Sequence, residues 1–180
     1  MTAEPAAAAT FSRVGHRTLH QGPVVSLAVV AVEGPDGNRY EREVVHHPGA
    51  VSVVPLTADG DVVLVRQYRA ALDAWLLELP AGKRDVPGED PMDTAARELV
   101  EEVGLRPGHM ELLAEFHNSP GFSDEHSLVY LASDLEATEH AREGIEERHL
   151  EVVEVPLESV PERVASGELR DAKTIIGLLV

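Results

Sequence analysis

The sequence contains no cysteine, and this absence limits both its covalent structure and its expected compartment. No disulfide can form, so a reducing cytoplasm is the simplest location for the chain. No apolar run reaches the roughly 20 residues that a membrane-spanning helix needs. The N-terminus also lacks the charged and then apolar pattern of a signal peptide. We therefore expect a cytoplasmic protein without a membrane partner.

Basic residues are scarce relative to acidic ones. The chain has 15 Lys and Arg against 32 Asp and Glu, which gives a formal net charge of −17. Nucleic acids and anionic membranes bind proteins through basic surfaces, so neither is expected as the main partner. A polyanionic substrate would be repelled as well, unless metal ions and a few arginines offset the negative field locally.

The length of 180 residues and the hydrophobic share of 43% suffice for one compact domain with a small extension. Residues 1–10 are rich in alanine and are expected to form a disordered tail. Residues 24–32 and 39–46 are strand-like and flank a turn-forming segment at 34–38. They predict a hairpin within a small N-terminal β-sheet extension over residues 11–48. An isolated hairpin is marginal in water, so its apolar face needs a partner.

The rest of the chain, residues 49–180, alternates strand-like and helix-like segments. The segments 51–57 and 61–68 are expected to pair as a second hairpin around a turn at 58–60. Further strands are expected at 110–116, 127–132 and 150–155, and helices at 159–166 and after the N-cap residue Asp171. Mixed strands with a few helices predict an α+β sandwich.

The most informative segment is a helix that is expected to begin after Asp90 and to end at Gly104. Asp90 is a good N-cap, Pro91 suits the first helical position, and Gly104 favours the left-handed conformation that ends helices. A loop rich in proline and glycine, residues 79–89, is expected before it. Such a loop can turn a backbone carbonyl toward a metal ion.

This helix is expected to have two opposed faces. One face carries the carboxylates of Glu98, Glu101 and Glu102, and the other is expected to be a buried apolar stripe of Ala96, Leu99, Val100 and Val103. The three like charges repel one another, but a bound hard cation such as Mg²⁺ or Mn²⁺ would offset this repulsion and favour three neighbouring carboxylates. A solvated acidic face is the alternative. The helix caps, the glycine-rich lead-in and the adjacent Arg97 favour the metal site.

The segment from Gly82 to Leu105 resembles the Nudix box. That pattern is glycine, five residues, glutamate, seven residues, and then Arg-Glu-aliphatic-x-Glu-Glu-x-Gly-aliphatic. From Glu89 onward every position agrees, through the run RELVEEVGL at residues 97–105. The one departure is that six residues, not five, separate Gly82 from Glu89. The extra residue lies in the expected loop, so the helical carboxylates should keep their geometry.

More of the chain is similar to one branch of that superfamily, the ADP-ribose pyrophosphatases. That branch has a proline about sixteen residues beyond the last box glycine, and Pro120 lies at this position. The segments 42–51, 65–69 and 78–82 are also similar to the branch. The resemblance implies a Nudix-type α/β/α sandwich with a mixed sheet over residues 49–180. It also implies that residues 11–48 form a homodimerisation region.

The resemblance further implies a role for each box residue. Glu98 and Glu102 are the expected direct metal ligands, with the carbonyl of Ala81 as a third. Glu101 is expected to bind the metal directly or through water. Arg97 is expected to orient a box carboxylate, the alternative being an ordinary surface ion pair. Glu89 is interpreted as a brace for the loop against Arg97.

The general base is expected to come from a later acidic loop, as in similar enzymes. The candidates are Glu143, Glu146 and Glu147, of which Glu146 is favoured and Glu147 is next, as base or as an extra ligand. A solvated loop charge is the alternative for each of them. Placement on a loop would let closure complete the site only when substrate is bound.

Four further residues are candidates for substrate contacts: Arg69, Glu78, Pro120 and Phe122. Arg69 can bridge two phosphate oxygens, and Glu78 can accept a hydrogen bond from the substrate, with a surface charge and a structural salt bridge as the respective alternatives. Phe122, like Tyr68 and Trp75, can stack on adenine, although such aromatics more often belong to a core. The nine histidines suggest no zinc site.

These residues together lead us to expect Mg²⁺- or Mn²⁺-dependent hydrolysis of ADP-ribose to AMP and ribose 5-phosphate. The alternative substrate is another nucleoside diphosphate derivative, such as a nucleotide sugar. The alternative from another class is a catalytically silent domain that binds ADP-ribose. The intact Glu98, Glu101 and Glu102 speak against it, because a domain that only binds need not keep them.

Overall fold

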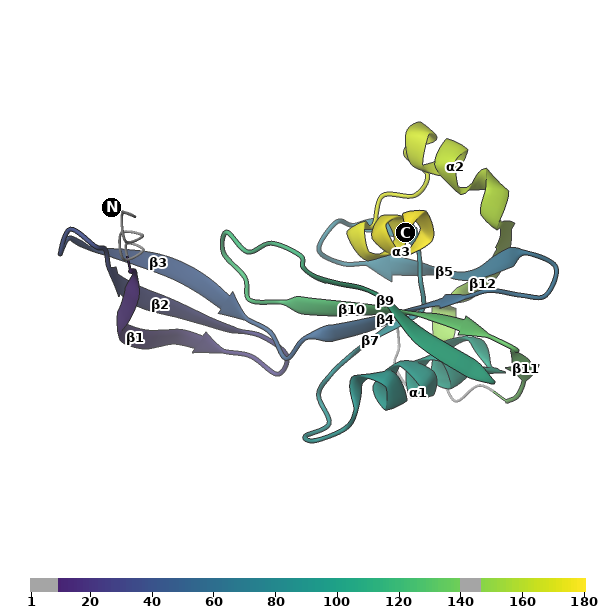
Figure 1. The fold of residues 1–180 in the computed structure, drawn as a ribbon, viewed down its shortest axis with the longest axis horizontal. Coiled ribbons are helices and arrows are strands. Elements are labelled where there is room, and N and C mark those ends of the chain that lie inside the picture. The colour runs from purple at the N-terminus through teal and green to yellow at the C-terminus, as the bar shows by residue number, and fades with distance from the viewer. Residues whose placement is uncertain (1–9, 140–146) are drawn as a thin grey trace, which may run out of the picture. The chain divides into compact units, whose positions relative to one another are not determined.

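The structure is a computed structural model that describes residues 10–139 and 147–180, and the chain divides into two compact units (Figure 1). The first unit contains the described residues up to Pro48 together with Ser119–Glu125. The second contains the described residues of Gly49–Asn118 and His126–Val180. None of the helices in these ranges is long and apolar enough to span a membrane.

The first unit is built on an antiparallel three-stranded sheet in the order β1-β2-β3. Its strands are β1 (Ser12–Gln21), β2 (Ser26–Glu33) and β3 (Arg39–His46). The predicted hairpin of β2 and β3 is confirmed, and its turn closes through a hydrogen bond from the Gly34 amide to the Asn38 carbonyl at 2.9 Å. Strand β1 was not predicted, because its polar, uniformly exposed sequence lacks the alternation that marks a half-buried strand.

The second unit contains a mixed sheet in the order β7-β4-β10-β9 and an antiparallel sheet in the order β12-β5-β6. The mixed sheet consists of β4 (Ala50–Pro55), β7 (Ala81–Lys83), β9 (His109–His117) and β10 (His126–Ser133), with β4 parallel to β10. The other sheet consists of β5 (Asp61–Arg69), β6 (Ala74–Glu78) and β12 (Glu151–Pro156). A short pair joins β8 (Leu105–Arg106) to β11 (Glu136–Ala137).

The predicted hairpin of residues 51–57 and 61–68 is wrong. Strands β4 and β5 do follow each other around a turn at Gly60, but they belong to different sheets and share only an isolated bridge between Leu56 and Val62. All six residues of β4 are buried, as in a strand covered on both faces. Such a strand lies in the middle of a layered core. Strand β4 pairs with β10 on one edge and with β7 on the other, and β5 belongs to the second sheet.

The helices of the second unit are α1 (Pro91–Val103), α2 (Val160–Ser166) and α3 (Ala172–Leu179), with short 3₁₀ turns η1 (Glu147–His149) and η2 (Leu157–Ser159). On one face of the mixed sheet, Val51 and Val53 pack with residues of α1 such as Leu99. On the other face, Val54 packs in a separate core cluster that includes Leu178 of α3. The unit is therefore an α/β/α sandwich, as predicted.

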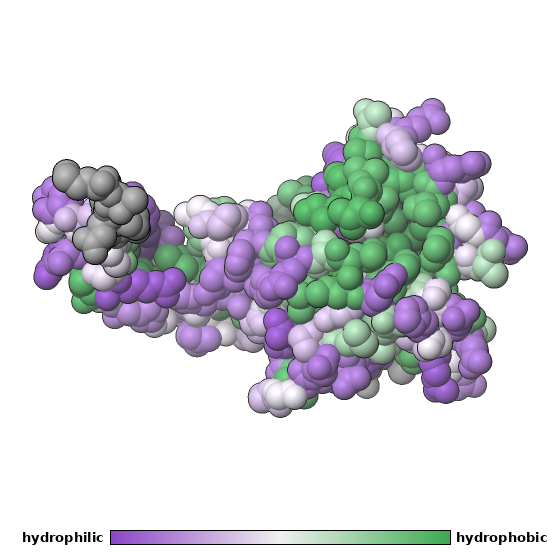
Figure 2. All heavy atoms as spheres, viewed as in Figure 1, coloured by the Kyte–Doolittle hydropathy of each residue, from purple (hydrophilic) through white to green (hydrophobic). Residues whose placement is uncertain are grey.

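Helix α3 approaches the sheet closely because Gly177 has no side chain. A Cβ at Gly177 would lie 2.8 Å from Val129, 2.9 Å from Leu79 and 3.1 Å from Val54. The outer surface over α3 is hydrophobic (Figure 2), and Leu179 there is exposed.

Candidate active site

The backbone of α1 begins and ends as its sequence predicts. The Asp90 carboxylate accepts a hydrogen bond from the Met92 amide at 2.8 Å, and Pro91 occupies the first helical position. At the other end Gly104 has a φ of 69°, and its amide donates to the carbonyls of Leu99 and Val100. These caps hold the helix that carries the predicted metal-binding carboxylates.

The buried face of α1 is rotated from the predicted one. Its buried residues are Thr94, Ala95, Leu99 and Glu102. The predicted apolar stripe was therefore wrong for Ala96 and Val100, which are half-buried and belong to no core cluster, whereas Leu99 is buried and Val103 packs against its cluster. Glu102 is 5% exposed, and its carboxylate accepts a hydrogen bond from the amide of Ala81 at 3.0 Å. This bond offsets part of the cost of burying the carboxylate and ties the end of α1 to β7.

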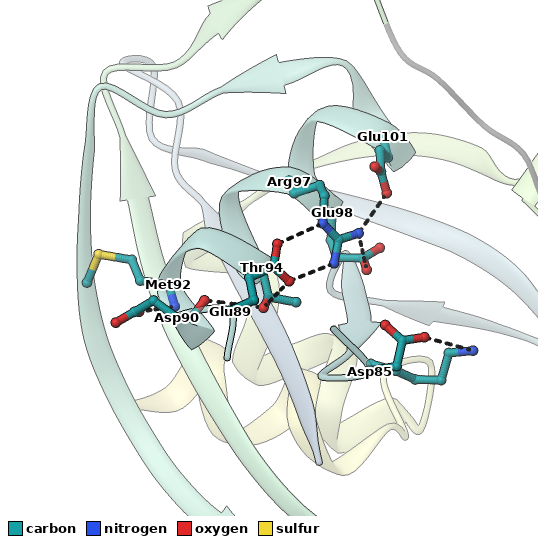
Figure 3. A network of polar contacts seen from close by, with 9 residues as sticks. Asp85, Glu89, Asp90, Met92, Thr94, Arg97, Glu98 and Glu101 are labelled. Carbon is teal, nitrogen blue, oxygen red and sulfur yellow. Dashed lines mark hydrogen bonds and ion pairs between the residues drawn. The ribbon is translucent and has the colours of Figure 1, made fainter. Parts of the chain in front are cut away.

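Arg97 is the centre of the polar network on α1 (Figure 3). Its guanidinium donates to Glu98 at 3.1 Å and to Glu101 at 3.2 Å, and it also donates to both oxygens of Glu89. The hydrogen bond to Glu89 and the three nearby carboxylates raise the pKa of Arg97 above its ordinary value. Arg97 is therefore a fixed positive charge that holds two box carboxylates on one side of the helix.

Glu89 connects the end of the lead-in segment to α1. Its carboxylate accepts a hydrogen bond from the Thr94 hydroxyl at 2.8 Å and two from Arg97. The bonds from Arg97 and Thr94 lower the pKa of Glu89, so it stays ionised. The interpretation of Glu89 as a brace against Arg97 is confirmed.

The segment before α1 is partly a strand and not wholly the predicted loop. Residues Ala81–Lys83 form β7, which pairs with β4. A Cβ at Gly82 would overlap the carboxyl group of Glu98. Glycine at this position therefore lets a carboxylate of α1 lie directly against the backbone of β7.

The donors at this place fit a hard divalent cation. They are the carboxylates of Glu98, Glu101 and Glu102 and the backbone of β7, all oxygen donors. The space that Gly82 leaves for Glu98 brings a carboxylate and a backbone segment together in one place. Within the described residues, no three histidine, aspartate or glutamate side chains converge as a finished metal cluster. Arg97 donates to one oxygen of Glu98 and to one oxygen of Glu101, so each carboxylate keeps lone pairs with which it could bind a cation.

Arg69 and Glu78 form a two-pronged ion pair with each other. The guanidinium donates to the two carboxylate oxygens at 2.8 and 2.7 Å, and Glu78 is 1% exposed. The structural salt bridge, which was the alternative for Glu78, is present. The hydrogen bond to Glu78 raises the pKa of Arg69 against the opposing effect of burial, and the charges of Asp171 and Glu102 add to it. Arg69 therefore lies within electrostatic range of one box carboxylate, that of Glu102.

Pro120 and Phe122 lie in a loop of the first unit, Ser119–Glu125. The loop is hydrogen-bonded to β3: the Val45 amide donates to the Phe122 carbonyl at 2.8 Å, and the Asp124 amide donates to the Val45 carbonyl at 3.2 Å. The Asp124 carboxylate accepts a hydrogen bond from the His47 amide at 2.9 Å and contacts the ring of His46. The Phe122 side chain is exposed, so it does not belong to a core.

The candidate bases Glu143 and Glu146 lie outside the described residues. Glu147 begins η1, the 3₁₀ turn that precedes β12. The choice of base among the three therefore stays a prediction.

The comparison with known proteins identifies the family. A family model described as "NUDIX domain" matches residues 46–175. An ADP-ribose pyrophosphatase of Bacillus subtilis is 42% identical over 89% of this chain and 86% of its own length. An ADP-ribose pyrophosphatase of Mycobacterium tuberculosis is 40% identical over 94% of this chain and 82% of its own. A "Methanol dehydrogenase activator" of Bacillus methanolicus is also 40% identical, over 89% and 86%.

A solved structure described as an ADP compounds hydrolase has the same fold. It superposes with a TM-score of 0.80 at 24% identity and covers 98% of this chain and 93% of its own. The chain thus belongs to the Nudix family. Within that family it is a pyrophosphohydrolase that resembles the ADP-ribose pyrophosphatases, as the sequence motifs predicted.

Proposed function

We propose that this Nudix pyrophosphohydrolase cleaves ADP-ribose to AMP and ribose 5-phosphate, with Mg²⁺ or Mn²⁺ as its cofactor. The observation that carries the proposal is the close approach of α1 to β7. Glu102 accepts from the Ala81 amide, and Glu98 fills the space that Gly82 leaves open. Carboxylates and a backbone segment from two rigid elements then face one place, as a hard cation requires.

Each residue of this site has a proposed task. Glu98, Glu102 and the Ala81 carbonyl are the proposed ligands, and Glu101 binds the cation directly or through water. A bound divalent cation neutralises charge on the phosphates and lowers the pKa of a bound water. Arg97 orients Glu98 and Glu101, because it already donates a charge-assisted hydrogen bond to each of them.

The remaining tasks concern the substrate and the proton. Arg69 is proposed to contact a phosphate, while Glu78 holds the guanidinium in place through their ion pair. Pro120 and Phe122 are proposed to contact the nucleoside, for which the exposed ring of Phe122 offers a stacking face. Glu146 is the proposed general base, with Glu147 as the next candidate.

The names of two relatives support ADP-ribose as the substrate. The position of Pro120 agrees with them. The third relative is named for its effect on another enzyme, and that name indicates no substrate. A nucleotide sugar stays the alternative substrate. A homodimer through residues 11–48 is part of the proposal, because the first unit contains a sheet whose strand β1 is exposed along its whole length.

Product analysis tests the substrate. Purified protein is incubated with ADP-ribose or with each member of a panel of nucleotide sugars, with and without Mg²⁺, and the products are separated by chromatography. We expect AMP and ribose 5-phosphate only with the metal, and faster turnover of ADP-ribose than of any sugar nucleotide. Faster cleavage of a nucleotide sugar would show that ADP-ribose is not the preferred substrate, while the proposed metal-dependent mechanism would stand. Absence of any cleavage would indicate a domain that only binds.

A further inference from the structure

The segment Glu78–Ala81 connects the two sheets of the second unit, and it contains Ala81, whose carbonyl is a proposed metal ligand. Strand β6 ends at Glu78 and β7 begins at Ala81, so only Leu79 and Pro80 cross between the sheets. Four side-chain or backbone groups hold this segment in place. Two of them lie on β4 and α1: the Val53 amide donates to the Pro80 carbonyl at 2.9 Å, and the Glu102 carboxylate accepts from the Ala81 amide. Two more come from the start of α3.

The first anchor from α3 is the hydroxyl of Thr174, which is fully buried. It accepts a hydrogen bond from the Leu79 amide at 2.9 Å and donates one to the carboxylate of Asp171 at 2.8 Å. An ionised carboxylate can only accept, so Asp171 takes the hydroxyl hydrogen and leaves a lone pair for Leu79. The direction of this short relay is thus set by Asp171.

The second anchor is the ammonium of Lys173. It donates to Asp171 at 2.6 Å and lies 3.7 Å from the carboxylate of Glu78, which Arg69 also holds. Lys173 therefore joins the N-cap of α3 to the residue that begins the crossing segment. Its positive charge also helps to keep the pKa of Asp171 below the ordinary value, against the opposing effect of burial.

We propose that Thr174 and Lys173 are positioning residues for the metal-binding donors, because they fix the Glu78–Ala81 segment that carries the Ala81 carbonyl and the amide that holds Glu102. This inference rests on the proposed function, since it assumes that the cation binds between α1 and β7. Residues that hold the ligands of a metal typically contribute about 10- to 100-fold in metal affinity or activity.

Direct titration with Mn²⁺ alone tests the inference, with free Mn²⁺ followed by electron paramagnetic resonance and no substrate present. Thr174→Val keeps the shape and removes the hydroxyl, and we expect its dissociation constant to rise about 10-fold. Thr174→Ser keeps the hydroxyl and should restore nearly the affinity of the unchanged protein. Lys173→Met should weaken binding in the same direction, and it serves as the second variant if Thr174→Val does not fold.

Thr57→Val is the matched control. The Thr57 hydroxyl also accepts a backbone amide, that of Asp61 at 3.1 Å, but it lies in the turn between β4 and β5. It should therefore bind Mn²⁺ as tightly as the unchanged protein. Equal Mn²⁺ affinities for Thr174→Val, Lys173→Met and Thr57→Val would overturn the positioning role while leaving the metal site in place. If the unchanged protein binds no Mn²⁺, the proposed function falls first and the inference falls with it.

A kinetic measurement separates positioning from general damage. Turnover of ADP-ribose by Thr174→Val should fall at low Mg²⁺ and recover at high Mg²⁺, because the affinity for the metal is lower while the rate of the metal-loaded enzyme is unchanged. A loss of turnover that no Mg²⁺ concentration restores, with unchanged Mn²⁺ affinity, would contradict the inference.

Discussion

At the scale of single residues, Gly82 is the position where the fold leaves room for the site. A Cβ there would overlap the carboxyl group of Glu98, so Gly82→Ala must move the Glu98 side chain away from β7. We expect turnover to fall, because a proposed metal ligand is displaced, and the free energy of unfolding to fall by only about 1 kcal/mol or less, because a flexible side chain can give way. Urea unfolding and steady-state rates measure the two effects.

Gly121→Ala is a suitable control for the stability part of this prediction. A Cβ at Gly121 would meet no atom within 4 Å. Its free energy of unfolding should therefore stay within about 0.5 kcal/mol of that of the unchanged protein. If Gly82→Ala turns over ADP-ribose as fast as the unchanged protein, Glu98 does not act from its place against β7.

The residue scale also marks how far the sequence could predict the site. The spacing of Glu98, Glu101 and Glu102 predicted one acidic helix face, but Glu102 is buried beside Leu99. Helical periodicity gives the relative angles of side chains and not which angle faces the core. Ala95 and Leu99 pack in the core, and the Ala81 amide on a strand far along the sequence satisfies the Glu102 carboxylate next to them, a partner that no local pattern reveals.

At the scale of elements, α3 depends on the charge of Asp171. Its carboxylate accepts hydrogen bonds from the amide and hydroxyl of Thr174 and from Lys173. Burial would raise the pKa of Asp171, but the charge of Lys173 and these hydrogen bonds outweigh it and lower the pKa below 3.8. The stabilisation is therefore fully present above the unfolded pKa, and it is lost as pH falls through the lower folded pKa.

Asp171→Asn tests this charge, because asparagine caps helices as well as aspartate does, while its NH2 group can no longer accept a bond from Lys173. At pH 7 we expect the variant to be less stable by about 1–2 kcal/mol. The difference should begin to shrink as the pH falls below the ordinary aspartate pKa, where the unfolded chain takes up a proton, and it should vanish only below the lower folded pKa of Asp171. Urea unfolding at pH 7 and at pH 3 measures both values. A stability difference that is the same at the two pH values would contradict the assignment.

At the scale of elements, the pairing of the strands could not be predicted from the sequence. The N-caps Asp90 and Asp171 are local signals, and both predicted helices begin where expected. Strands β4 and β5 were predicted from equally clear local patterns, yet each has one partner far along the chain, β10 and β12 respectively, besides its pairing with β7 or β6. A short turn favours a hairpin only when nothing else competes for the strand, and here burial of both faces of β4 decided the pairing.

At the scale of the whole molecule, the claim to test is the proposed homodimer through the first unit. Exposed apolar side chains on and beside the sheet of that unit are Val14 and Leu19 of β1, with Phe11 just before β1 and Val24 and Val25 between β1 and β2. A small sheet with such a surface needs cover to be stable in water. We expect light scattering to give twice the chain mass of 19.5 kDa, and Leu19→Glu to shift the protein toward the monomer. A mass of 19.5 kDa for the unchanged protein would contradict the dimer.

The central claim is that the carboxylates of α1 bind the divalent cation on which hydrolysis depends. The measurement that tests it most directly is turnover of ADP-ribose by Glu102→Gln over a range of Mg²⁺ concentrations. Glutamine keeps the shape and can still accept from the Ala81 amide, so the fold should persist. We predict a loss of about 100-fold or more. Glu158→Gln, an exposed carboxylate on η2, should keep full turnover. Unchanged Mg²⁺-dependent turnover by Glu102→Gln would contradict the account.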